Sequence, residues 1–154
     1  MIGISEDRLH HIIGVARKAY SIAKEMGYDE DFAKRMWMIG WVYDVGCEFS
    51  ENQSEHPKVS SELLHQLVCG HEIYDTPVSL KTNHAIYYHG MYPDESIEYN
   101  LEWKILNMAD MLIDSKGNEV TVSQKLDDIK RHYGEYSSQY LMACDICQRI
   151  GLTA

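Results

Sequence analysis

Two aspartates stand in apolar surroundings where a carboxylate is costly. Asp44 lies between valines at the C-terminal end of an expected helix, where the helix dipole disfavours a negative charge by roughly 0.3–1 kcal/mol. Asp110 lies inside the apolar run 105–113, where an unpaired buried charge would cost several kcal/mol. Each acid therefore needs a helix-end hydrogen bond, an arginine partner or a bound cation. The occurrence of both favours a functional site.

Eight histidines supply candidate partners for these acids. His11 lies at the edge of an expected apolar helix face, His56 opens a helix and His89 ends another. His84 lies on the same helix as His89 but is rotated from it by roughly 140°. Imidazoles and carboxylates together bind divalent transition metals, although a single histidine is more often a core or surface residue. The residues alone leave both interpretations open.

The elements that would position these side chains are helices, because apolar residues recur mostly at spacings of three and four. Ser5 and Asp29 are expected N-caps, and Gly27 is an expected helix end. The expected helices cover about 5–26, 29–45, 54–69, 76–89 and 96–114, followed by one or two that break near Gly134 and end at Gly151. The pattern predicts an all-α bundle of six or seven helices, with a cleft between the first, second, fourth and fifth.

The order of these residues resembles the HD-domain metal-dependent phosphohydrolase superfamily, especially its small single-domain bacterial members, over about residues 8–114. Segment 8–16, RLHHIIGVA, matches best with His11 as the family's first histidine. Segment 40–46, GWVYDVG, matches the apolar-His-Asp-apolar-Gly motif, and segment 56–64, HPKVSSELL, matches a histidine that opens the next helix. Segments 85–90, AIYYHG, and 108–111, MADM, match a later histidine and the final aspartate.

The resemblance implies a metal held by His11, Asp44 and Asp110. It also implies that Asp44, His56 and His89 are catalytic. The metal would be a divalent transition ion such as Mn, Fe, Ni or Zn, which would activate water and supply the missing counter-charge of both aspartates. The implied activity is the hydrolysis of a small phosphorylated molecule, with a nucleotide as the expected substrate.

Tyr43 departs from the family pattern, because it stands where the motif has its defining histidine. A phenol with a pKa of about 10 is neutral at pH 7 and is a poor ligand beside imidazole. The metal can therefore be absent. Otherwise another histidine would have to replace the lost ligand, and the candidates are His10, His56, His84 and His89.

Two alternatives to catalysis follow from this departure. The first is a degenerate HD module that binds a nucleotide or a protein partner without turnover. The second is a purely structural α-bundle, against which the paired Asp44 and Asp110 argue. In a metal-free pocket, the Tyr43 hydroxyl would bind one of the two aspartates.

Composition and net charge limit the number of domains, the partners and the location that we expect. The 154 residues, 45% hydrophobic and 25% charged, predict one folded domain over residues 1–154. A net charge of −10 opposes binding to a phosphate backbone, so nucleic acid is not an expected partner. No apolar run reaches the roughly 20 residues that span a bilayer, and residues 1–8 do not resemble a signal peptide. We therefore expect a cytoplasmic protein without a membrane partner, in which Cys144 and Cys147 pack within a helix rather than bind metal.

Overall fold

A computed structural model describes residues 5–44, 56–69, 80–90 and 100–152. Seven α-helices lie in these ranges, and no extended strand does, so the expected all-α architecture is confirmed for the described residues. The helices are α1 (Glu6–Glu25), α2 (Glu30–Val42), α3 (His56–Cys69), α4 (Leu80–Tyr87), α5 (Leu101–Met111), α6 (Val122–Tyr133) and α7 (Ser138–Ile150). None of these helices is long and apolar enough to cross a membrane.

Local signals set the ends of α1 and α2 as the sequence predicts. The hydroxyl of Ser5 accepts a hydrogen bond from the backbone of Arg8, and the carboxylate of Asp29 accepts one from Phe32. These bonds satisfy backbone donors that have no partner inside the first turn of a helix. Gly27, at φ 86°, turns the chain between the two helices.

Three expected helix boundaries change in the structure. The fifth helix begins at Leu101 rather than at residue 96, because Asn100 is its N-cap and accepts a hydrogen bond from Trp103. It ends at Met111 rather than at residue 114, because Ile113 leaves the helix to form a bridge with Glu119. The second helix ends at Val42, with Tyr43 as its C-cap, whereas the expected terminator Gly46 lies outside the described residues. The expected starts of the third and fourth helices, at residues 54 and 76–77, also lie outside them.

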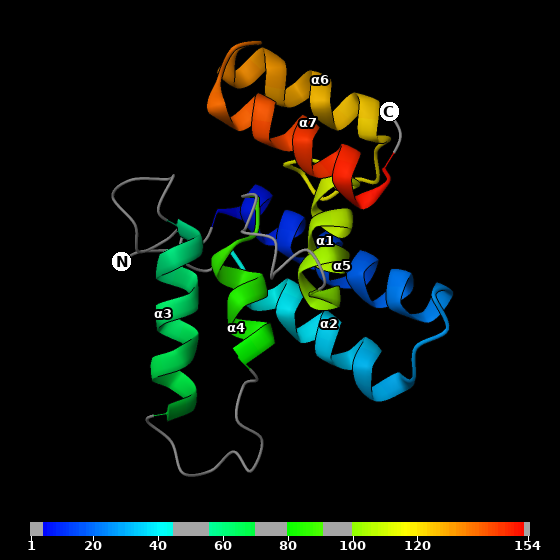
Figure 1. Ribbon diagram of the computed structural model, residues 1–154, viewed down its shortest axis with the longest axis vertical. Coiled ribbons are helices and arrows are strands. Elements are labelled where there is room, and N and C mark those ends of the chain that lie inside the picture. Colours follow the sequence, from blue (N-terminus) through cyan, green and yellow to red (C-terminus); the bar gives the residue numbers. More distant parts are fainter. Residues whose placement is uncertain (1–4, 45–55, 70–79, 91–99, 153–154) are drawn as a thin grey trace.

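The central core lies between α1, α2 and α5, with Ile86 added from α4 (Figure 1). α1 and α2 approach closely because Gly40 faces Ala16, where a Cβ atom on the glycine would lie 2.4 Å from the Ala16 Cα. α3 packs on α4, and the α6–α7 hairpin lies beyond the far end of α5. The predicted break between these two helices falls at Gly134 (φ 100°), and Gly151 caps α7 at φ 79°.

This packing brings the two unusual acids to one place. Asp110 is in the last turn of α5, and Asp44 follows the end of α2 directly. α1, which packs on both α2 and α5, begins its buried face with His11. The ends of three packed helices therefore present these side chains to a common space.

Candidate metal and phosphate site

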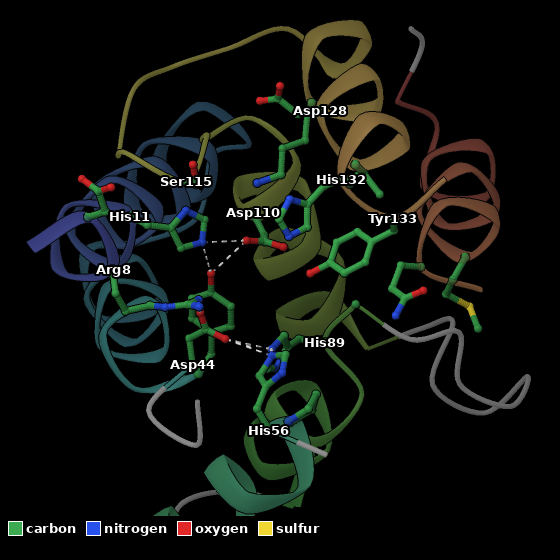
Figure 2. Close-up of a pocket in the computed structure, with 18 of the residues that line it drawn as sticks. Arg8, His11, Asp44, His56, His89, Asp110, Ser115, Asp128, His132 and Tyr133 are labelled. Carbon is green, nitrogen blue, oxygen red and sulfur yellow. Dashed lines mark hydrogen bonds and ion pairs between the residues drawn. The ribbon is translucent and has the colours of Figure 1, made fainter. Parts of the chain in front are cut away.

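A cavity of about 970 Å³ opens where α1, α2 and α5 meet the starts or ends of the other helices (Figure 2). A volume of this size is at the upper end of the range of small-molecule sites. One side carries the titratable side chains Arg8, His11, Asp44, His56, His89 and Asp110. The α6–α7 hairpin forms the opposite side. The expected cleft therefore also includes residues of α3, α6 and α7.

Asp44, His56 and His89 form a compact group at one end of this cavity. The Oδ1 atom of Asp44 lies 3.0 Å from Nε2 of His56 and 3.5 Å from Nε2 of His89, and the two Nε2 atoms are 2.8 Å apart. Among the described residues, these three offer the one set of histidine, cysteine or acidic ligand atoms that all lie within 4.8 Å of one another. Their side chains come from α3, the end of α4 and the end of α2.

His89 is oriented by its second ring nitrogen. Its Nδ1 lies 2.7 Å from the backbone oxygen of Ile86, which can only accept a hydrogen bond. Nδ1 therefore carries a proton, and in the neutral ring Nε2 keeps its lone pair on the side of Asp44 and His56. A hydrogen bond from the non-ligating nitrogen of histidine to a carbonyl is the usual support of a metal ligand. The donor set of two imidazoles and one carboxylate thus fits a divalent transition metal.

The Asp44 carboxylate is buried and ionised. Burial alone would raise its pKa, but interactions with the His56 and His89 rings outweigh burial and hold the pKa well below its usual value. The Nη1 atom of Arg8 lies 2.5 Å from Oδ2, so the two carboxylate oxygens have different partners. The positive charge of Arg8 therefore compensates Asp44 directly, which the sequence left as one of several possibilities.

His11, Tyr43 and Asp110 form a second group in the same cavity. The Tyr43 hydroxyl donates to Oδ1 of Asp110 over 2.8 Å and lies 2.7 Å from Nε2 of His11. His11 Nε2 and Asp110 Oδ1 are themselves 3.1 Å apart. The other His11 nitrogen, Nδ1, lies 2.7 Å from the backbone oxygen of Asp114 and must donate to it. The phenol oxygen, the His11 nitrogen and the Asp110 oxygen therefore form a triangle of mutual contacts (Figure 2), and the phenol contacts both groups that the sequence predicts as metal ligands.

The electrostatics keep Tyr43 protonated. Its ring is buried, and burial together with the charges of Asp110 and Asp44 raises the pKa of the phenol well above its usual value. The pKa of Asp110 is lowered, since the positive charge of Lys125 and the hydrogen bond from His11 outweigh the effect of burial. Burial would lower the pKa of His11, but the hydrogen bond and charge of Asp110 raise it overall. At neutral pH this group offers a phenol rather than a phenolate to any ligand.

The two groups adjoin, because the rings of Tyr43 and His89 meet edge to face with centroids 4.7 Å apart. All of the expected site residues thus line one cavity, while the expected metal set of His11, Asp44 and Asp110 stays a prediction. The ligand atoms that converge within the described residues are those of Asp44, His56 and His89. His10 lines a separate, smaller cavity, and the side chain of His84 is not among those that the structure describes.

Sequence reasoning missed Arg8 and the contribution of α6. Arg8 stands three residues before His11, a spacing that places both on one helix face and could have indicated it. Lys125 donates to the backbone oxygen of Ile113 over 2.6 Å and lowers the pKa of Asp110. No sequence motif ties Lys125 to this site, because only the packing of α6 near α5 brings it there.

One member of the cysteine pair, Cys147, packs in a core cluster, as the sequence predicts. Cys147 is buried against Met111, Val122 and Ala143. Burial and the neighbouring Cys144 raise the pKa of the Cys147 thiol to about 11, so the thiol is protonated at neutral pH.

Comparison of the chain with protein-family models, with curated proteins and with solved structures found no match. Any assignment of function therefore depends on the residues and geometry described above.

Proposed function

We propose that this chain is a metal-dependent hydrolase of small phosphate esters, of the HD-domain type, with Asp44, His56 and His89 as the metal ligands. The observation that carries the proposal is the convergence of two imidazole nitrogens on one buried carboxylate oxygen. The proposed substrate is a small phosphorylated molecule, such as a nucleotide, in a cytoplasmic setting. The net charge of −10 makes a local cation necessary for binding such an anion.

The residues around the proposed metal position have separate tasks. When bound, a divalent transition metal would act as a Lewis acid that neutralises phosphate charge and activates water. Asp44 would supply the negative charge that holds the ion, and the Ile86 carbonyl keeps the His89 ring in the tautomer suited to ligation. Arg8 lines the cavity beside Asp44, where its guanidinium can also attract phosphate oxygens.

In this proposal the second group, His11, Tyr43 and Asp110, is linked by hydrogen bonds and does not bind the metal. Tyr43 remains a hydrogen-bond donor at neutral pH because its pKa is raised. Contacts with His11 and Asp110, which also contact each other, fix the position of its hydroxyl. This group shapes the part of the cavity next to the metal ligands and keeps the Asp110 carboxylate hydrogen-bonded.

A non-catalytic binding module is the second candidate function. It is favoured by the Tyr43 hydroxyl, which contacts two potential ligands, and by Arg8, which already compensates Asp44. In such a module the same cavity would bind a phosphorylated molecule, and no metal would be needed for the fold.

Metal analysis of protein purified without chelator, followed by calorimetric titration with Mn²⁺, separates the two candidates. We expect about one Mn²⁺ per chain, lost in His56→Ala and retained in His10→Ala, a matched control because His10 lines a different cavity. Hydrolysis of p-nitrophenyl phosphate and of nucleoside monophosphates should then require Mn²⁺. Binding of these esters without metal uptake or turnover would favour the binding module.

A further inference from the structure

The α6–α7 hairpin carries a cavity-lining surface that the proposed metal chemistry does not use. α6 has an apolar stripe at spacings of three and four, formed by Val122, Leu126, Ile129 and Tyr133. The first three members pack with Met111 and residues of α7. Tyr133 continues the stripe beyond this packing and is 52% exposed, although it lines the cavity.

The polar residues of α6 that line the cavity lie beside this stripe. Lys125, Asp128 and His132 follow one another at spacings of three and four, so they share one helix face. Asp128 forms an ion pair with Arg131, and the rings of His132 and Tyr133 meet edge to face with centroids 4.7 Å apart. Figure 2 shows His132 and Tyr133 extending from α6 toward the side where Asp110 and His89 lie.

We infer that Tyr133, supported by His132, is a specificity-determining residue that binds a flat aromatic or heteroaromatic group of the phosphate ester. This inference rests on the proposed function, in which the phosphate is held near Asp44, His56 and His89. A cavity of about 970 Å³ leaves space beyond the phosphate for an organic group. A ligand that reaches from the Asp44 group across the cavity meets the α6 wall, where the Tyr133 ring lines the cavity and is accessible to a flat ligand group. Stacking on such a face tolerates different ring systems but discriminates against small aliphatic groups.

Two phosphonates that differ only in the organic group test this inference. Phenylphosphonate and methylphosphonate carry the same anionic head and resist hydrolysis, so calorimetric titration of the Mn²⁺-loaded protein compares them directly. We expect phenylphosphonate to bind about tenfold more tightly than methylphosphonate. Tyr133→Ala should remove this preference while methylphosphonate affinity stays the same, and Tyr133→Phe should retain it.

Tyr136→Ala is the matched control, because Tyr136 lies on the same hairpin, is 89% exposed and does not line the cavity. It should leave both affinities unchanged. Equal affinities for the two phosphonates, or a preference that survives Tyr133→Ala, would overturn the inference and leave the metal site untouched. Absence of Mn²⁺ uptake overturns the proposed function instead, and absence of binding of either phosphonate to the Mn²⁺-loaded protein overturns both.

Discussion

The hydroxyl of Tyr43 donates a hydrogen bond of 2.8 Å to Oδ1 of Asp110. The same hydroxyl lies 2.7 Å from Nε2 of His11, which is itself 3.1 Å from Oδ1 of Asp110. A phenol oxygen thus completes a triangle of contacts with an imidazole and a carboxylate, two groups that otherwise suit a divalent metal. The cavity therefore contains two different groups of polar residues. In one group the ligand atoms of Asp44, His56 and His89 converge, and in the other a protonated phenol contacts both potential ligands.

Tyr43→His should raise the affinity of the protein for Mn²⁺, Fe²⁺ or Ni²⁺ by about tenfold or add a second bound ion. The substitution replaces a neutral phenol by a nitrogen donor near His11 and Asp110. Calorimetric titration of both proteins measures the change. Tyr43→Phe removes the hydroxyl without adding a ligand and should bind metal as the parent does. Equal affinities of Tyr43→His and the parent would show that a side chain at residue 43 cannot reach a metal.

Local signals in the sequence were enough to predict much of the fold. Ser5, Asp29, Gly134 and Gly151 each fix a helix end through a cap or a positive φ, and these features depend on near neighbours in the chain. Asn100 was not predicted as an N-cap, because the sequence placed the start of this helix at about residue 96. Capping is decided by backbone geometry, which composition alone does not reveal.

The partners of the acidic site residues depend on long-range packing and were less predictable. Asp44 and Asp110 were identified because a carboxylate is costly in apolar surroundings, but Arg8 and Lys125 were not identified as their cationic neighbours. The buried Glu102 shows the same limit, because its ion pair with Arg35 and its hydrogen bond from Thr82 join three different helices. Sequence spacing identifies a residue that needs a partner more readily than the partner itself.

Asp44→Asn should abolish metal binding and destabilise the protein by about 2–3 kcal/mol, even without added metal. The amide removes the negative charge that Arg8 and the two histidines face, and breaking a buried ion pair leaves such charges uncompensated. This outcome differs from the simple expectation that neutralising one of two buried acids relieves repulsion. Thermal melts of parent and variant, with and without Mn²⁺, measure both effects. A variant as stable as the parent would show that Arg8 contributes little to the folded state.

Arg8→Gln should bind Mn²⁺ about fivefold more tightly and phosphate more weakly. The guanidinium lies on the Asp44 carboxylate, so it repels a divalent cation nearby while attracting an anion. Calorimetry with Mn²⁺ and then with inorganic phosphate tests the two effects separately. Arg17→Gln, on an exposed part of the same helix, is the control and should change neither affinity. A parallel loss of both affinities in Arg8→Gln would mean that Arg8 mainly positions Asp44.

His11→Gln should reduce stability most at acidic pH. The pKa of His11 is raised in the folded state, because the hydrogen bond and charge of Asp110 outweigh burial. The stabilisation from the protonated ring is therefore fully present below the unfolded pKa of about 6.5 and is lost as pH rises through the folded pKa. Urea unfolding between pH 5.5 and 8.5 should show the difference between parent and variant narrowing above about pH 6.5. A difference that does not depend on pH would show that protonation of His11 does not contribute to the stability of the folded state.

Gly40→Ala should destabilise the protein by about 3 kcal/mol and weaken Mn²⁺ binding, although residue 40 does not line the cavity. A Cβ atom there would lie 2.4 Å from Cα and 2.8 Å from N of Ala16, so α1 and α2 would have to separate. Tyr43 and Asp44 follow one turn later and would move with α2. Gly27→Ala is the control, because a Cβ atom at φ +86° meets no atom within 4 Å and costs only about 1 kcal/mol of backbone strain. Urea unfolding and Mn²⁺ titration compare the two variants, and a Gly40→Ala protein as stable as Gly27→Ala would show that the helix contact can relax without disturbing the site.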